Sequence, residues 1–490
     1  MPVQAPLARR PGLSLQLQRR RPSPRRAPFP ALHPAPGSGR LAVALDREAL
    51  RRGLRICTWE GVTAQLHLSV VTSAVLTGLA LRLGAGELTL GLLGALPIAC
   101  RPLQLLSAAL LDRGVDHKPI FTWGALIHRA VWIVPALLLL WPLGDDTRLS
   151  LLVAAVAVSY AAAAPTENAW VSWAADYVPA GIRGRYFGLR NLILYAVGQT
   201  AALGAAFCVD RLGPADAGLS HLLVFGAAVL SGLVSVWLLA RYPEPRRRHS
   251  QGFRLLPGLR RALANPNLRR LLVAAGLWNV AVGIGGPFFA PHALDHIGLD
   301  YTTFQFYGVL WTVAALLTNR FWGRALDDFG SRPLLVIAGA ALGVFPLIWA
   351  LTGPGLSWPL WPEALASGTC WAAFNLALFA APLGIAKRET RPYAIAAVAV
   401  TTGLGYLGGS TLGGLLAEGI GGTRPLLDGW LTGYQSTFIV SGLARLGAAA
   451  FFARLDDPGG DHLRPLAAHL GEVGLKRPLY WLRGLFRRTE

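Results

Sequence analysis

The chain has 490 residues and a formal net charge of +20, and it is 53% apolar but only 15% charged. Its charged residues avoid long apolar stretches of roughly twenty residues, the length that a helix needs to cross a bilayer. This composition excludes a set of soluble domains. The positive charge does not indicate nucleic-acid binding, because the arginines concentrate at the chain ends and in alternate loops.

Both chain ends differ from the apolar middle. Residues 1–50 are rich in Arg and Pro and lack apolar periodicity, so we expect a disordered segment there and no cleaved signal peptide. Within the C-terminal tail, 456–490, residues 464–490 combine basic and aromatic side chains. We favour an amphipathic helix on the inner leaflet for this tail over the alternative, a frayed end.

Between these ends lie twelve apolar spans, which predict an all-α integral membrane protein with twelve transmembrane helices in two six-helix, pseudo-symmetric halves. The N-terminal half, 51–240, contains spans near 61–83, 89–111, 119–142, 149–173, 186–209 and 217–240. The C-terminal half, 271–455, contains spans near 271–292, 302–322, 332–352, 358–384, 394–418 and 433–453. A basic linker, 241–270, joins the halves. Glycines crowd the eleventh span, where they let helices approach closely.

Basic residues mark alternate loops. The loops after spans 2, 4, 8 and 10 and the central linker carry most of the loop arginines and lysines, whereas the opposite loops carry few. By the positive-inside rule these loops and both termini face the cytoplasm. We therefore expect a multi-pass protein of a bacterial inner membrane.

A Gly/Asp/Arg turn occurs at the same place in both halves. Residues 323–333, GRALDDFGSRP, follow span 8, and a degenerate copy at 108–119, AALLDRGVDHKP, follows span 2. Both copies resemble the loop motif of the Major Facilitator Superfamily, G-x-L-a-D-r-x-G-r-k, which follows the second and eighth helices of that fold. The first copy has Ala108 in place of the leading glycine. The residues that match the motif are Asp112 and Arg113 in the first copy and Gly323, Asp327, Gly330 and Arg332 in the second.

This resemblance implies that the loop takes part in conformational switching. Its aspartate can cap the following helix and pair with arginines across the half-bundle, and its glycine lets two helices meet tightly. The alternative is an ordinary polar turn between membrane helices. Residues 170–191, WVSWAADYVPAGIRGRYFGLRN, also resemble a bacterial facilitator subgroup. This likeness implies that Asp176 lies at the cytoplasmic mouth of the protein, within reach of the first-half arginines that would form a cytoplasmic gate. The resemblance extends over about residues 50–455.

No catalytic or cofactor motif is visible. The sequence lacks a P-loop, a nucleotide fingerprint and a His/Cys set at metal-ligand spacing, so we expect no enzyme activity, no cofactor and no metal. A duplicated bundle without an ATPase sequence is typical of a secondary transporter. The expected partners are a small-molecule solute, membrane lipids and, as a candidate coupling ion, the proton. We expect no nucleic-acid partner and a monomeric protein.

Polar side chains inside apolar spans are candidates for substrate binding or proton coupling, because such groups are costly in a bilayer. Glu167 reads as the only acid deep within a first-half span, where it either binds a proton or forms a structural pair with Arg101 or Arg129. Asn375 holds the matching position in the second half, so both could face a central cavity. An asparagine in a membrane helix more often bonds a neighbouring helix. The full candidate set is Arg101, His128, Arg129, Glu167, Asn279 and Asn375.

Together these patterns predict a secondary active transporter that moves a small amphipathic or anionic solute by alternating access, with proton coupling left open. The rival hypothesis is a non-transporting membrane protein of the same fold, such as an assembly factor or a receptor. The degenerate first loop and the thin polar lining of the second half give this rival some support.

Overall fold

The computed structural model describes residues 47–243, 255–387, 389–421 and 431–456, and these residues form helices and no β-strand. The predicted disorder of residues 1–50 falls almost entirely outside these ranges, and the predicted surface helix at 464–490 does so completely. The chain divides into two compact units, 1–50 and 51–490.

The first half forms six spans, several of them interrupted. Helices α1 (Arg47–Val71) and α2 (Ala74–Arg82) form span 1, while α3 (Glu87–Ala99), the 3₁₀ turn η1 (Arg101–Leu103) and α4 (Gln104–Asp112) form span 2. The remaining spans are α5 (His117–Ala130) with α6 (Ile133–Leu137), α7 (Asp145–Tyr177), α8 (Ala180–Leu212) and α9 (Ala217–Leu239). Short polar side chains start some of these helices: Ser73 accepts the Val75 N–H of α2, and Asp216 accepts the Leu219 N–H of α9.

The second half begins with a short helix inside the predicted linker. This is α10 (Leu255–Leu263), followed by α11 (Pro266–Gly285), η2 (Gly286–Phe288), α12 (Phe289–Pro291) and η3 (His292–His296). The long helices α13 (Tyr301–Phe329), α14 (Ser331–Ala350), α15 (Leu360–Ile385), α16 (Arg391–Ile420) and α17 (Gly433–Phe452) complete it. Helix α11 starts before the predicted span at 271, because the Asn265 side chain caps it and Pro266 occupies its first position.

All twelve predicted spans are helical in the structure. Within the described residues, ten helices are long and apolar enough to cross a membrane. The other two predicted spans correspond to α13 and α17. They are equally helical but more polar, since α13 contains Asn319 and Arg320 and α17 contains Gln435 and Arg445.

Helix α16 packs closely on both halves, as its glycines predict. A Cβ at Gly409 or Gly413 would collide with the backbone of α11, and a Cβ at Gly414 would meet Leu88 of α3 at 2.9 Å. Only residues without a side chain permit these approaches. Helices α3 and α16 therefore form part of the contact between the halves.

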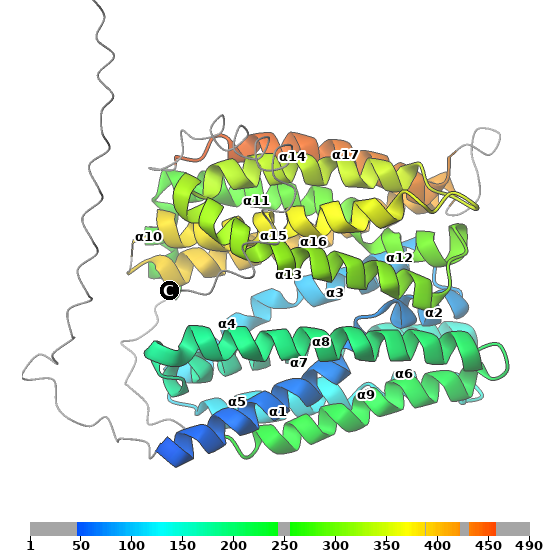
Figure 1. Cartoon of the computed structure of the whole chain (residues 1–490), viewed down its shortest axis with the longest axis horizontal. Coiled ribbons are helices and arrows are strands. Elements are labelled where there is room, and N and C mark those ends of the chain that lie inside the picture. The colour runs from blue at the N-terminus through cyan, green and yellow to red at the C-terminus, as the bar shows by residue number, and fades with distance from the viewer. Residues whose placement is uncertain (1–46, 244–254, 388, 422–430, 457–490) are drawn as a thin grey trace, which may run out of the picture. The chain divides into compact units, whose positions relative to one another are not determined.

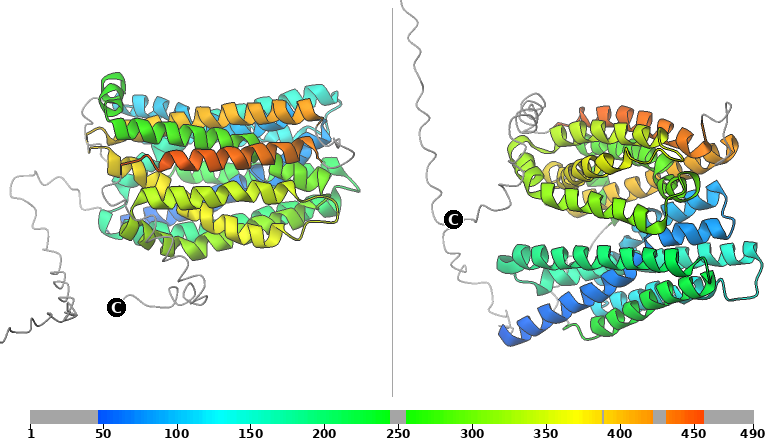
Figure 2. Two further views of the ribbon diagram at one scale, coloured as in Figure 1. Left: turned by 90° about the horizontal axis from the view of Figure 1, so that it is seen from above. Right: turned by 45° about the vertical axis from the view of Figure 1, so that its right-hand side comes forward.

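Figures 1 and 2 show the helices of the two halves as two neighbouring bundles with their long axes roughly aligned. The turns after α4, α7, α13 and α15 lie at one end, together with α10, and we call this the basic end. The turns after α2, α6, α8, η3 and α14 lie at the opposite end, which we call the far end.

Candidate functional site

At the far end, Asp210 joins the two halves. This residue lies in the last turn of α8, and its carboxylate accepts the backbone N–H groups of Tyr301 at 3.0 Å and Thr302 at 2.7 Å. Those groups are the free donors at the N-terminus of α13, where a negative charge also complements the helix dipole. One carboxylate of the first half thus caps a helix of the second.

A second pair of hydrogen bonds joins the same helices nearer the middle of the molecule. The Gln199 amide of α8 donates to the Thr312 hydroxyl at 2.9 Å and accepts from the Gln305 amide at 3.2 Å. Together with Asp210, these bonds hold α8 against α13 from the far end inward.

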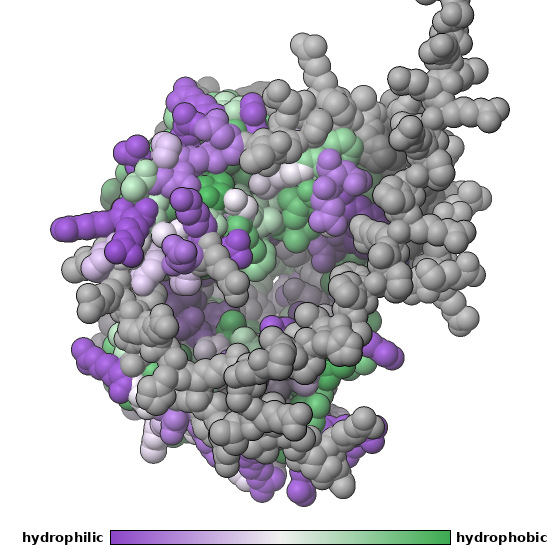
Figure 3. All heavy atoms as spheres, turned by 90° about the vertical axis from the view of Figure 1, so that its left-hand side faces the viewer, coloured by the Kyte–Doolittle hydropathy of each residue, from purple (hydrophilic) through white to green (hydrophobic). Residues whose placement is uncertain are grey.

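At the basic end the molecule is hollowed. Figure 3 views that end and shows hydrophilic side chains around a recess, whose visible walls carry both hydrophilic and hydrophobic residues. The six predicted coupling residues line two pockets of the larger unit, three in each. We call these the first-half pocket, lined by Glu167, His128 and Arg129, and the interface pocket, lined by Arg101, Asn279 and Asn375.

The first-half pocket, of about 370 Å³, contains a buried ion cluster centred on Glu60 of α1. One oxygen of Glu60 lies 3.4 Å from Arg129 Nη2 of α5, and the other lies 3.7 Å from Arg190 Nη2 of α8. The Tyr242 hydroxyl donates to Glu60 at 3.0 Å. Burial and the neighbouring Glu60 charge raise the pKa of Tyr242 well above its usual range, which keeps its proton available for this bond.

The expectation that Glu167 is the only acid deep in a first-half span is wrong. Glu60 lies just before the predicted span at 61–83, but α1 begins at Arg47 and carries it into the buried interior. Arg129 pairs with Glu60 and not with Glu167, which is exposed on the pocket wall, and Arg101 lies in the other pocket. The sequence signal that could have found Glu60 is the run of Leu54, Ile56, Cys57 and Trp59, which extends the apolar pattern before it.

The imidazole ring of His128 is held in place by contacts with neighbouring side chains. Its ring nitrogen Nδ1 lies 2.7 Å from the Ser159 hydroxyl, which also accepts a hydrogen bond from the Trp132 indole at 2.8 Å. The His128 ring packs edge-to-face on His67, with 5.3 Å between the ring centres. These contacts make His128 part of the wall that positions Arg129.

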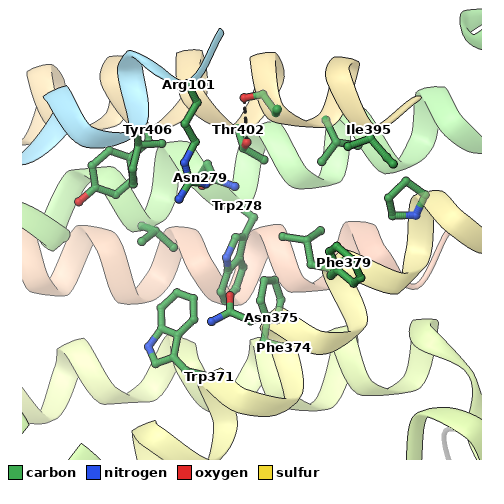
Figure 4. A pocket seen from close by; sticks show the side chains of 16 residues that line it. Arg101, Trp278, Asn279, Trp371, Phe374, Asn375, Phe379, Ile395, Thr402 and Tyr406 are labelled. Atoms are coloured by element: carbon green, nitrogen blue, oxygen red, sulfur yellow. Dashed lines mark hydrogen bonds between the residues drawn. The ribbon is translucent and has the colours of Figure 1, made fainter. Parts of the chain in front are cut away.

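The interface pocket lies where α11, α15 and α16 meet η1 and encloses about 390 Å³. Pro97 inside α3 and Pro102 inside η1 accompany the interruption of span 2, and the exposed Arg101 stands at this break. Figure 4 shows its side chain reaching toward Asn279 of α11. The Asn279 amide donates to the Ala275 carbonyl at 2.9 Å, while Asn375 is exposed on the wall formed by α15.

Aromatic side chains form much of the remaining wall. Trp278 is 1% exposed and stacks on Phe374 with 4.2 Å between ring centres, so it packs in the core. Trp371 is half-buried and Phe379 is 69% exposed, so both rings can be reached from the pocket. Figure 4 places these rings across the pocket from Arg101.

A further pocket of about 400 Å³ holds Glu363, which the sequence analysis missed. Glu363 accepts hydrogen bonds from the Tyr307 hydroxyl at 2.7 Å and from the Trp349 indole at 3.2 Å. Val282 and Trp371 line both this pocket and the interface pocket, so the two adjoin. The sequence did not indicate Glu363 as a candidate, because this residue lies at the start of a span, among tryptophans typical of a membrane interface.

Arg445, buried on α17, lines the pocket of Glu363 and donates to the Leu342 carbonyl at 3.4 Å. A buried arginine in a membrane helix can serve either as an anion site or as one member of a buried pair. Its place beside a buried acid favours the structural role.

The turn motif has a geometry different from the one expected. Asp327 lies exposed in the last turn of α13, and Gly330 is the residue between α13 and α14, with φ 81° and ψ 179°. The expectation that Asp327 caps α14 is therefore wrong. Gly323 lies inside α13, and a Cβ there would meet open space, so close helix contact does not explain this glycine. Arg332 is the second residue of α14.

The first copy of the motif behaves in the same way. Asp112 is the last residue of α4, and Asp116 is the residue preceding α5. Arg113 is exposed just beyond α4. Asp176 is exposed in the last turn of α7, whose end is held by Arg183 through hydrogen bonds to the Ala175 and Val178 carbonyls.

Comparison with known families supports the facilitator resemblance. The family model described as Major Facilitator Superfamily matches residues 62–361 and 280–488. Two Arabidopsis thaliana proteins, zinc induced facilitator-like 1 and zinc induced facilitator 1, are 29% and 30% identical over 116 and 121 residues. Each match spans 23% of this chain and 23% of the plant protein, so it covers about a quarter of those relatives.

Solved structures share the fold at low identity. A bacterial homologue of the iron transporter ferroportin in an inward-facing state aligns with a TM-score of 0.64 and 14% identity, covering 83% of this chain and 99% of its own. The xylose transporter XylE from E. coli, in an inward open conformation, aligns with a TM-score of 0.62 and 15% identity, covering 86% and 99%. Both likenesses concern the arrangement of the helices.

Proposed function

Because this chain belongs to the Major Facilitator Superfamily and is a multi-pass membrane protein of a transporter family, we propose that it moves a small solute across its membrane by alternating access. The halves 51–240 and 271–455 are the two bodies that rock about the pockets between them. The positive-inside pattern supports a cytoplasmic location for the basic end and both termini. A bacterial inner membrane is the location consistent with that orientation.

One observation carries this proposal. The far end is joined by Asp210 and by Gln199, whereas the basic end is hollowed, and the predicted coupling residues line pockets of the same unit. A closed far end with an open basic end is one of the two end states that alternating access requires. The charged turns at the basic end would then close the opposite state.

The proposal is tested by side-specific labelling of two cysteines in reconstituted vesicles. The reporters are Ala399→Cys in the interface pocket and Ser367→Cys in the pocket of Glu363, each in a background where the four native cysteines are replaced by alanine. An impermeant maleimide should label Ala399→Cys from the basic side and Ser367→Cys from the far side within one population. Access from the basic side alone would support the non-transporting rival.

Proton coupling through Glu167 is the finer part of the proposal. Glu167 supports it as an exposed carboxylate in a pocket where Glu60 already neutralises one arginine charge. We expect Glu167→Gln to abolish the pH dependence of transport and of the labelling at Ala399→Cys, with folding intact. Glu418→Gln, at an exposed carboxylate near the end of α16, is the matched control and should retain that dependence. Unchanged pH dependence in Glu167→Gln would exclude this residue as the coupling site.

A further inference from the structure

The interface pocket contains a single charged side chain among the described residues that line it, and that side chain is Arg101. No described residue forms a hydrogen bond or an ion pair with its guanidinium, whose five N–H donors are therefore available. A cation inside the membrane region is costly and usually pairs with an anion or faces water. Arg101 is exposed and can face water, and a bound anion would supply the pairing.

The cations of the first-half pocket are already engaged. Arg129 and Arg190 share the Glu60 carboxylate, and the Arg190 guanidinium also lies over the Trp170 ring at 4.9 Å. An anion entering that pocket would meet both Glu60 and the exposed Glu167. Charge thus directs an anionic solute to Arg101.

Amide groups extend the polar corner around Arg101. Asn279 spends one amide hydrogen on the Ala275 carbonyl, and the second remains beside the guanidinium. Asn375 projects from the opposite helix into the same pocket. A planar carboxylate fits this set, because a guanidinium binds it through two parallel hydrogen bonds.

The wall opposite the polar corner is aromatic. Phe379 is 69% exposed and Trp371 is half-buried, so their rings can contact a solute, while Trp278 and Phe374 stack behind them. Ring pairs of this kind prefer offset or edge-to-face contact with another planar group. A volume of about 390 Å³ accommodates one small organic molecule.

We propose that the interface pocket binds a small aromatic carboxylate, with its carboxylate on Arg101 and Asn279 and its ring against Trp371 and Phe379. This assignment rests on the proposed function, since it names the class of solute that the transporter carries. The binding itself is a property of the purified protein and can be measured without transport.

The experiment measures binding to the full chain in detergent by calorimetry with four probes of similar size. These are 3-phenylpropionate, the neutral 3-phenylpropan-1-ol, the cationic 3-phenylpropylamine and the non-aromatic hexanoate. A charge-assisted bond to Arg101 should make 3-phenylpropionate bind at least about tenfold more tightly than the alcohol or the amine. Hexanoate should bind more weakly than 3-phenylpropionate, because it lacks the ring.

Variants separate the two parts of the site. Arg101→Gln should weaken 3-phenylpropionate at least about tenfold and leave the alcohol unchanged, while Arg101→Lys, which keeps the charge but not the fork, should lie between. Phe379→Leu should weaken binding of the three ring-bearing probes and spare hexanoate. Arg148→Gln, at a far-end arginine that pairs with Asp145, is the matched control and should change nothing.

Equal binding of the acid and the alcohol, or unchanged affinity in Arg101→Gln, would overturn the assignment. Flux of 3-phenylpropionate into proteoliposomes is measured separately. Binding in the expected pattern without flux supports the pocket and counts against the proposed transporter. Labelling from both sides of the membrane, without tighter binding of 3-phenylpropionate than of the alcohol, would support the proposed transporter and count against the assignment of the pocket.

Discussion

The two halves hold buried acids in different ways. In the first half, Glu60 lies between two arginines, so the cluster keeps a formal excess of positive charge. In the second half, Glu363 is held by a phenol and an indole, both neutral donors. The first half thus holds its buried acid in an ionic centre, whereas the second half holds its buried acid through neutral hydrogen-bond donors.

This difference distinguishes charges that stabilise the protein from a charge that can bind a solute. The first-half charges stabilise one another and leave little for a solute. Among the described residues that line the interface pocket, the single charged one, Arg101, comes from the first half across the boundary. The second half contributes the aromatic and amide walls. In the proposed transporter, recognition of the solute would therefore depend on contact between the halves, and a rocking motion would make and break that contact.

The largest effect should come from removing the acid of the ionic centre. Glu60→Gln leaves Arg129 and Arg190 buried without a counter-charge, and breaking a buried pair in this way costs about 3–5 kcal/mol. Glu363→Gln is the matched control, because its amide oxygen can still accept from Tyr307 and Trp349, so the cost should stay below about 2 kcal/mol. The free energy of unfolding in detergent measures both. Equal losses would show that the two acids are held alike.

A smaller effect is expected where the halves are joined. Asp210→Asn weakens a charge-assisted cap on α13 worth about 1.5–3 kcal/mol, so the far end should open more often. Far-side labelling of Ser367→Cys should rise roughly tenfold or more. The control is Asp216→Asn, which weakens a similar cap on α9 within the first half and should leave that labelling unchanged. A rise in the control as well would trace the effect to general loosening.

A feature of this protein could be predicted from the sequence when its signal lies within one local stretch of the chain. Apolar runs predicted the position of every span, and polar residues inside those runs, such as Arg101 and Asn279, were recognisable as candidates from the neighbouring sequence. Glu60 and Glu363 were missed because both sit at span edges, and their burial depends on which helices become neighbours. The partners of Glu60 lie on α5 and α8, and a single sequence does not record that pairing.

The turn motif shows the same limit. Its recurrence predicted a duplicated bundle, but the expected capping role is wrong for Asp327, which belongs to the helix before the turn. The backbone requirement falls instead on the glycines after α4 and α13, Gly114 with φ 94° and Gly330 with φ 81°. The first copy therefore keeps its turn despite having Ala108 at the leading position.

The two glycines of the second copy should respond in opposite directions. Gly330→Ala forces a side chain into a backbone region that only glycine adopts readily, at a cost of about 1–3 kcal/mol. Gly323→Ala adds a Cβ in open space within a helix and should stabilise α13 by about 0.5–1 kcal/mol. Thermal unfolding of the two variants measures the signs. A loss at Gly323 would mean that a close contact forms there in another state of the protein.

The smallest effect on this state should come from Asp327. It is exposed at the basic end, where a surface charge contributes at most about 1 kcal/mol, so Asp327→Ala should barely change the free energy of unfolding. If the motif closes the basic end in the opposite state, the same variant should still raise basic-side labelling of Ala399→Cys. Asp328→Ala, the neighbouring exposed acid on α13, is the control. Equal labelling in both variants would leave the motif as a polar turn, and closure of the basic end would then have to come from packing of the helices alone.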